Sequence, residues 1–152
     1  MADKIIENQV FEKLDCSEKI LEIAEYDNCT FNGCNFLNSD LSHSVFLECT
    51  FKDCDLSMAQ LKNTAIKDVA FKNCKLLGLD FSDCNQFLLQ LSFEDCNLNL
   101  ALFYQLKLKA TKFKNCSLHE VDFTETELTS STFDNCDFQR AIFGNTILEK
   151  SD

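Results

Sequence analysis

Ten cysteines and two histidines are the side chains of this chain best suited to covalent, acid–base or metal chemistry. Eight of the cysteines follow a phenylalanine by three residues, and six of these pairs recur at intervals of 20, 20, 22, 20 and 20 residues. A zinc site needs four ligands that converge on one point, and the chain contains no Cys-x-x-Cys motif. The regular spacing therefore favours a repeated structural position over a metal site. The six pairs are Phe31/Cys34, Phe51/Cys54, Phe71/Cys74, Phe93/Cys96, Phe113/Cys116 and Phe133/Cys136.

A high cysteine content also occurs in small secreted proteins that are held together by disulfides. Those scaffolds are usually shorter than about 100 residues and carry a signal peptide. Residues 1–20 contain no apolar run as long as a signal-peptide core. We therefore expect a cytoplasmic protein with reduced, buried thiols that react slowly. Cys16 is the expected exception, because it lies outside the regular spacing.

A finer period of five residues runs through each 20-residue block. Large apolar residues recur at this interval, as in Phe31, Phe36, Leu41, Phe46 and Phe51, and a small residue, often cysteine, stands two residues before each. Helices repeat near 3.6 residues and strands at 2, so the pattern fits neither. Residues i−2 and i point the same way on an extended backbone, so each unit offers one large and one small inward side chain.

Four units of five residues make one turn of 20 residues, and stacking such turns places residue i beside residue i+20. The core then contains one column of phenylalanines and one column of cysteines, with successive turns about 4.8 Å apart. Asn and Asp at the corners, as in Asp53 and Asn73, replace the glycines that tight turns usually need. We predict a single domain in which residues 1–28 form an N-terminal capping segment and residues 29–152 form the repeat array. The columns are Phe31, Phe51, Phe71, Phe93, Phe113 and Phe133, and Cys34, Cys54, Cys74, Cys96, Cys116 and Cys136.

The five-residue units resemble those of the pentapeptide-repeat family. Clear examples are Cys-Asp-Leu-Ser-Met at 54–58 and Cys-Asn-Leu-Asn-Leu at 96–100, and the resemblance covers about residues 29–148. It implies an all-β fold, namely a four-sided (quadrilateral), right-handed parallel β-helix solenoid with 20 residues per coil.

Catalytic chemistry is not expected on such a scaffold. His43 and His119 fall in outward positions of the repeat, whereas the cysteines of the array fall in inward ones, so no Cys–His nucleophile pair is expected. The chain lacks a glycine-rich phosphate loop. A prism filled by its own side chains also offers no deep pocket. We therefore predict no catalytic residues, no cofactor and no metal.

The five-residue phase breaks once, between Phe81 and Phe93, where two extra residues are inserted. In one interpretation Phe87 or Leu88 folds inward at a β-bulge. In the other interpretation the bulge projects outward and, with nearby outward apolar residues, presents a contact patch to a partner. The candidate contact residues of this second interpretation are Gln86, Phe87, Leu89, Leu102 and Tyr104.

The chain carries 25 acidic residues against 14 lysines and arginines, a net charge of −11. This acidity disfavours direct binding to nucleic acid or to an anionic membrane. The Phe-rich repeats with their cysteines and a mid-array interruption resemble the quinolone-resistance (Qnr-type) branch of the family. That resemblance implies an acidic, rod-shaped DNA mimic that binds DNA gyrase and topoisomerase IV and confers fluoroquinolone resistance. The alternative is a structural or interaction module with an unrelated protein partner.

The C-terminal coil leads to a further expectation about assembly. Phe133, Phe138, Phe143 and Leu148 form its inward layer, and only residues 149–152 follow. Solenoids normally cover such a layer, since it exposes core side chains and unpaired strand edges. We therefore expect a homodimer in which two C-terminal coils meet, because closed two-fold contacts are the commonest assembly.

Overall fold

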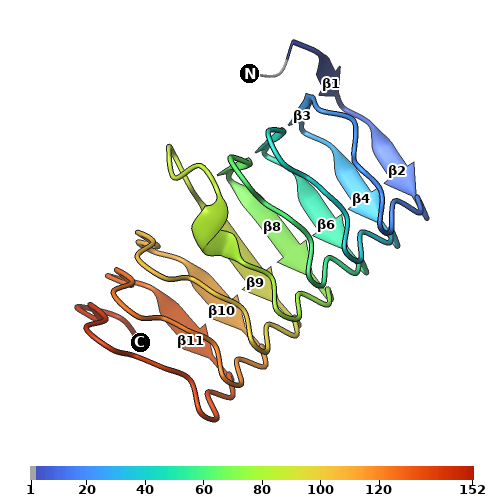
Figure 1. Cartoon of the computed structure of the whole chain (residues 1–152). Helices are drawn as coiled ribbons and strands as arrows, with labels where there is room; N and C mark the ends of the chain where they lie inside the picture. The colour runs from blue at the N-terminus through green and yellow to red at the C-terminus, as the bar shows by residue number, and fades with distance from the viewer. Residues whose placement is uncertain (1–2) are drawn as a thin grey trace.

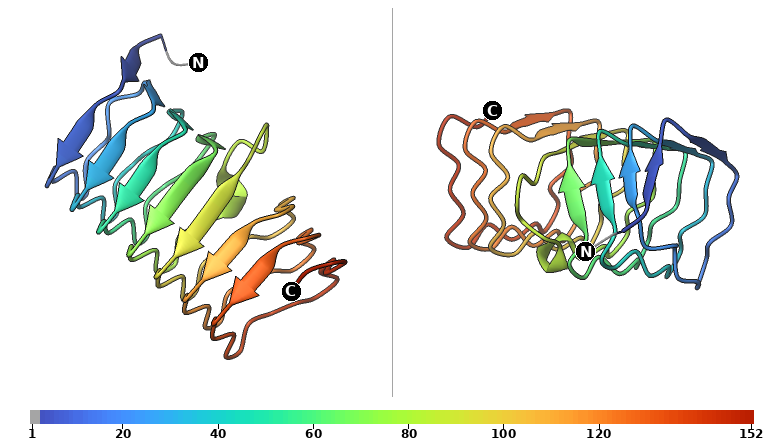
Figure 2. Two further views of the ribbon diagram at one scale, coloured as in Figure 1. Left: turned by 180° about the vertical axis from the view of Figure 1, so that it is seen from behind. Right: turned by 90° about the horizontal axis from the view of Figure 1, so that it is seen from above.

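The computed structural model describes residues 3–152 and shows a four-sided prism of stacked coils (Figure 1). The termini lie at opposite ends of the prism, and the strands of one face lie side by side in chain order (Figure 2). Two faces are parallel sheets, one of seven strands in the order β11-β10-β9-β8-β6-β4-β2 and one of four in the order β1-β3-β5-β7. Isolated parallel bridges, such as Asp15 to Asn35 and Asp40 to Gln60, hold the other two faces. The architecture confirms the predicted all-β parallel solenoid.

The strands are short, and each occupies part of one face. The only helical segment among residues 3–152 is η1 (Phe81–Asp83), a 3-10 turn, and no helix there is long and apolar enough to cross a membrane. The strands are β1 (Ile5–Glu7), β2 (Val10–Glu12), β3 (Glu25–Asp27), β4 (Thr30–Asn32), β5 (Val45–Leu47), β6 (Thr50–Lys52), β7 (Ala65–Lys67), β8 (Val69–Lys72), β9 (Leu91–Glu94), β10 (Lys112–Lys114) and β11 (Thr132–Asp134).

A residue with left-handed backbone at nearly every fifth position turns the coil from one face to the next. Asp53, Asn73 and Asn115 have φ values of 55°, 50° and 53°. Asn and Asp tolerate this region better than most residues do. Stacked corners also bond to one another, since Asn73 Nδ2 donates to Asp53 Oδ1 at 2.7 Å. The prediction that Asn and Asp replace glycine is thus confirmed at corners such as Asp53 and Asn73, whereas Glu, Lys, Leu and other residues fill many of the remaining corners.

Phenylalanine rings fill the interior of the prism. Neighbouring rings of the Phe31–Phe133 column stack with centroids 4.7 to 5.4 Å apart. Rings of adjoining faces meet edge to face, as Phe103 and Phe113 do. Such aromatic pairs stabilise a core beyond the burial of their area. The structure places all members of the column inside, although Phe133, in the last coil, is only half-buried.

The N-terminal residues join the same two sheets. β1 pairs with β3 and β2 pairs with β4, so the regular coil already begins at Ile5, before the predicted array boundary at residue 29. Leu21 and Ala24 are buried, and Phe11 and Leu14 pack against the core while half-buried. That residues 1–28 also act as a cap for the solenoid stays a prediction.

Candidate functional site

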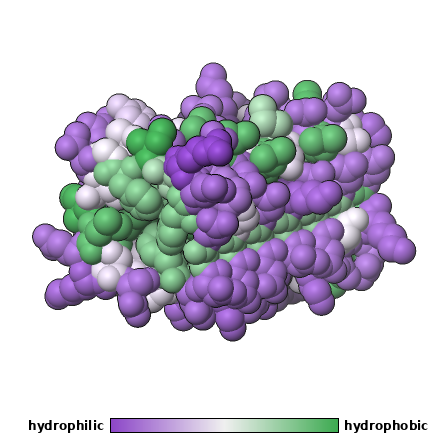
Figure 3. Space-filling view, turned by 90° about the horizontal axis from the view of Figure 1, so that it is seen from below, coloured by the Kyte–Doolittle hydropathy of each residue, from purple (hydrophilic) through white to green (hydrophobic). Residues whose placement is uncertain are grey.

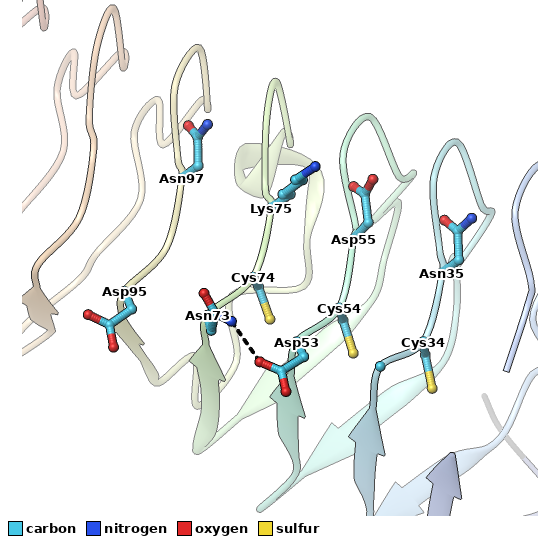
Figure 4. A pocket seen from close by; sticks show the side chains of 11 residues that line it. Cys34, Asn35, Asp53, Cys54, Asp55, Asn73, Cys74, Lys75, Asp95 and Asn97 are labelled. Carbon is cyan, nitrogen blue, oxygen red and sulfur yellow. Dashed lines mark hydrogen bonds between the residues drawn. The ribbon is translucent and has the colours of Figure 1, made fainter. Parts of the chain in front are cut away.

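The cysteine column runs along a shallow groove at the corner that follows the seven-stranded sheet. The groove has a volume of about 520 Å³, with Cys34, Cys54 and Cys74 along its line. Seen from below, a narrow hydrophobic band lies between rows of hydrophilic side chains (Figure 3). A close view shows the three sulfur atoms aligned from coil to coil (Figure 4). The flanking side chains are Asn35, Asp53, Asp55, Asn73, Lys75, Asp95 and Asn97.

Each thiol of this column donates a hydrogen bond to a carbonyl of the preceding coil. Cys54 Sγ lies 3.1 Å from Phe31 O, and Cys96 Sγ lies 3.3 Å from Phe71 O. The five cysteines from Cys34 to Cys116 have only 2 or 3% of their surface exposed. Buried thiols of this kind behave as small hydrophobic residues with a weak donor. The column therefore has a structural role along most of its length.

The accessible thiol is not the one that the sequence indicated. Cys16 is only 7% exposed, and Ser39 Oγ donates to its sulfur at 3.4 Å, so the expectation that Cys16 reacts most readily is wrong. The physical reason is that its coil already belongs to the solenoid. All ten cysteines are free, and nine are buried, whereas Cys136 is half-buried.

The structure also places the two histidines away from the thiols. His119 Nε2 lies 2.7 Å from Asp137 Oδ2 on the outer surface, and this hydrogen bond lowers the pKa of Asp137. His43 lines an open depression on the face of the four-stranded sheet, together with Asn63 and Lys67. Within residues 3–152, no group of three or more His, Cys, Asp or Glu side chains could hold a metal ion. Among residues 3–152, neither histidine forms a hydrogen bond with a thiol.

The two inserted residues form a loop that projects from the prism. In Figure 1 the yellow-green segment extends beyond the turns of the neighbouring coils. Asn85 still bridges to Ala65 before the loop, and Leu91 pairs with Val69 after it, so the register is restored at β9. Leu88 takes a left-handed φ of 57° at the turn. The insertion therefore leaves the seven-stranded sheet continuous, whereas on the face of the four-stranded sheet no bridge among residues 3–152 joins Asn85 to Lys107.

This loop points its largest side chains outward. Phe87 and Leu88 are 67% and 65% exposed, so the interpretation that either folds inward is wrong. The flanking inward positions are already filled by Cys84 and Leu91, at 7% and 3% exposed. Lys67 Nζ lies 5.5 Å from the centre of the Phe87 ring, a distance at which a cation is attracted to an aromatic face.

The other candidate contact residues divide into three groups. Gln86 is exposed beside Phe87, whereas Leu89 is half-buried and packs against the core, so Leu89 does not extend the projecting surface. Leu102 and Tyr104 are 37% and 43% exposed, but they belong to the face that contains the Asp80–Leu102–Asp122 bridges. Phe87 follows Asn85 on the adjoining face. The structure therefore does not bring the five candidates into one patch.

A second exposed apolar surface lies at the corner before Leu102, and its members are not among the candidate contact residues predicted from the sequence. Met58 and Leu100 are 56% and 49% exposed and stand at the same corner two coils apart. Gly78 occupies that corner in the coil between them, and a Cβ there would lie 2.5 Å from Met58 Sδ. The sequence could have indicated this surface, because Met58 is an apolar residue at a position of the five-residue repeat that is expected to face solvent.

Comparison with known proteins supports this architecture. The pentapeptide repeat region is matched over residues 24–87 and again over residues 88–152. No curated protein matches the chain in sequence.

Two solved structures of similar fold have different roles. A trypsin-treated variant of QnrB1, a plasmid-mediated fluoroquinolone resistance protein, is 18% identical, with a TM-score of 0.53 over 100% of this chain and 91% of that one. HetL, a pentapeptide repeat protein involved in heterocyst differentiation regulation in the cyanobacterium Nostoc sp. strain PCC 7120, is 14% identical. Its TM-score is also 0.53, over 97% of this chain and 84% of that one. The repeat units, the stacked coil and the match over residues 24–152 together show that this chain belongs to the pentapeptide repeat family.

Proposed function

We propose that this protein is a non-enzymatic, acidic rod that acts by binding another protein. The observation that carries the proposal is the loop at residues 86–90, which holds Phe87 and Leu88 about two-thirds exposed on a prism with a filled interior. Aromatic and aliphatic side chains held on a rigid scaffold are typical anchors of protein interfaces. Pentapeptide repeat proteins of this fold are generally interaction proteins rather than enzymes.

The partner that we propose first is a type II topoisomerase, either DNA gyrase or topoisomerase IV, with the protein acting as a DNA mimic. Asp40, Asp80 and Asp122 lie in one row along a face, two coils or about 10 Å apart. Each carboxylate accepts a hydrogen bond from the backbone N–H two residues on, at 2.8 to 3.0 Å, and the hydrogen bonds from Ser42 lower the pKa of Asp40. A regular row of fixed negative charges supports binding to a surface built for DNA phosphates.

The similarity to QnrB1 in fold supports the same partner and a role in fluoroquinolone resistance. HetL resembles the chain to the same degree, with the same TM-score of 0.53, and its role is different. Because one fold hosts many functions, this equality favours a second candidate, an interaction module with an unrelated protein partner. The exposed loop is compatible with both candidates.

A DNA supercoiling assay with purified gyrase and a fluoroquinolone tests the first candidate. We expect the protein to restore supercoiling in the presence of the drug, and we expect Phe87→Ser to abolish this effect. Ile20→Ser is the matched control, because Ile20 is a 73% exposed aliphatic residue in the first coil. Surface substitutions of this kind leave stability nearly unchanged. If the wild-type protein leaves supercoiling unaltered with and without drug, the topoisomerase proposal fails and the unrelated partner remains.

We also propose that the protein forms a homodimer through its C-terminal coil. Phe143 and Leu148 are 38% and 46% exposed in the inward layer of that coil. Burying these side chains against a second copy would remove apolar surface from water. We propose a cytoplasmic location as well, because all ten cysteines are free and the cytoplasm keeps thiols reduced.

A further inference from the structure

Cys116 and Cys136 are neighbours in the last two coils of the cysteine column. Phe113 pairs with Phe133 just before them, and Ser117 bridges to Asp137 just after them, so the two cysteines stack in register. Coils about 4.8 Å apart lie within the Cα separation that a disulfide spans, and the two Cβ atoms must move to within about 4.5 Å of each other for the bond to form.

Both thiols lean back over the preceding coil, and each also lies near a carbonyl of its own coil; Cys116 Sγ is 3.7 Å from Phe93 O. Cys136 Sγ leans back over the preceding coil and lies 3.4 Å from Phe113 O. Cys116 Sγ lies 3.3 Å from Lys114 O, the next carbonyl along the same coil. Both sulfur atoms therefore contact one short segment of backbone.

The two thiols differ in their access to solvent. Cys116 is 3% exposed, whereas Cys136 is half-buried and so can be reached by a small solute. Interaction with the Cys116 thiol lowers the pKa of Cys136 to about 7, and the same interaction raises the pKa of Cys116. An accessible thiol that ionises near neutral pH, next to a second thiol, is the usual arrangement of a redox-sensitive pair.

We propose that Cys136 and Cys116 form a redox-sensitive pair whose oxidant is a hydroperoxide. The Cys136 thiolate attacks the peroxide, the O–O bond breaks, and Cys136 becomes a sulfenic acid while the leaving oxygen takes up a proton as water or alcohol. The Cys116 sulfur then attacks the Cys136 sulfur, the S–O bond breaks, and a second water leaves with the Cys116 proton. Two thiols are oxidised to one disulfide, and one hydroperoxide is reduced.

The disulfide would tie the last coil to the one before it. The segment between the two cysteines is one full turn of the solenoid, so the bond closes a loop of about 20 residues and restricts the unfolded chain. Serine can replace either cysteine without leaving the carbonyls of the preceding coil unpaired. Ser131, at the same inward position of another unit, donates to Leu108 O at 2.7 Å.

Hydrogen peroxide titration of the full chain, kept dilute and followed by alkylation and peptide mapping, tests the proposal. We expect two thiols to be lost together and a Cys116–Cys136 cross-linked peptide within one chain. Cys116→Ser should stop at a sulfenic acid on Cys136 that dimedone traps, and Cys136→Ser should abolish the reaction. Cys54→Ser, which removes a buried member of the same column, should leave the cross-link unchanged.

Three results would overturn the proposal. The first is oxidation spread evenly over the column, the second is a disulfide between two copies, and the third is no reaction before the protein unfolds. Circular dichroism of each serine variant provides the folding check. If Cys136→Ser is unfolded, the cross-linked peptide in the wild-type protein and the trapped sulfenic acid in Cys116→Ser still decide the outcome.

Discussion

Cys74 Sγ lies 3.2 Å from the carbonyl oxygen of Phe51 in the preceding coil. Thr64 and Thr126, at the same inward position of other units, donate to Leu41 O and Phe103 O at 2.8 Å. Cysteine, serine and threonine at this position therefore add a hydrogen bond between coils, whereas other units hold an apolar residue there, such as Ala59 or Val69. Sequence reasoning treated the cysteines as small hydrophobic residues and did not include this hydrogen bond.

The first prediction concerns this donor. Cys74→Ala should lower the free energy of unfolding by about 1 to 2 kcal/mol, because it removes one hydrogen bond and leaves a small void. Cys74→Ser keeps a donor for Phe51 O and should cost less than the alanine variant. Urea denaturation of both variants measures the difference. A serine variant less stable than the alanine variant would show that volume alone governs this position.

The second prediction concerns the phenylalanine column. Phe113 is fully buried and stacks on Phe93 and Phe133 with centroids 5.1 and 4.8 Å away. Phe113→Ala should therefore cost about 3 to 5 kcal/mol through lost burial and a cavity.

Lys114 provides the matched control for this column. Its Nζ lies 3.8 Å from Glu94 Oε1 at the surface, so Lys114→Ala should change stability by less than about 0.5 kcal/mol. The two free energies come from chemical denaturation under identical conditions. Equal losses would contradict the assignment of Phe113 to the interior.

The stacking of the coils could be predicted from the sequence because one residue type fills each of two columns, phenylalanine from Phe31 to Phe133 and cysteine from Cys34 to Cys136. The 22-residue step from Phe71 to Phe93 is also visible in the sequence, and the two residues pair in the structure. Periodic burial leaves this pattern wherever the same position is filled by the same kind of side chain. The all-β solenoid was therefore predictable.

The first coil and the insertion were not predictable to the same degree. The five-residue repeat already runs through the first coil, at Ile6, Phe11, Cys16, Leu21 and Tyr26. The repeat was not recognised there because Cys16 occupies a position that usually holds Phe or Leu. Residues 86–90 do not follow the five-residue repeat, so the pattern of apolar residues could not show whether the Phe87 side chain points inward. That direction depends on Cys84 and Leu91 already occupying the interior.

The third prediction concerns alkaline pH. Burial raises the pKa of both Cys49 and Cys84 to about 12. Their thiols stay protonated in the folded chain while those of the unfolded chain ionise near pH 8.5. The contribution of these two protonated thiols to the free energy of unfolding is therefore full below about pH 8.5 and is lost as the pH rises toward 12.

The free energy of unfolding, measured by urea titration between about pH 7 and pH 10, should therefore fall above about pH 8.5. Cys49→Ser should have a shallower slope in that range, because one ionising group has been removed. Lys114→Ala should keep the slope of the wild-type protein. A stability independent of pH across this range would mean that these thiols are solvated in the folded state.

The last prediction concerns the proposed dimer. Phe143 and Leu148 expose apolar surface in the inward layer of the C-terminal coil, so two copies that meet there should bury it and cover the nearby Cys136. Sedimentation or light scattering should show a mass that doubles as the concentration rises. Alkylation of Cys136 should slow over the same range, whereas alkylation of the buried cysteines stays slow throughout. The thiol measurement matters because charged substitutions at Phe143 would also damage the core and could not separate assembly from folding. A protein that remains monomeric at every concentration, or a dimer that leaves the Cys136 rate unchanged, would contradict contact through this coil.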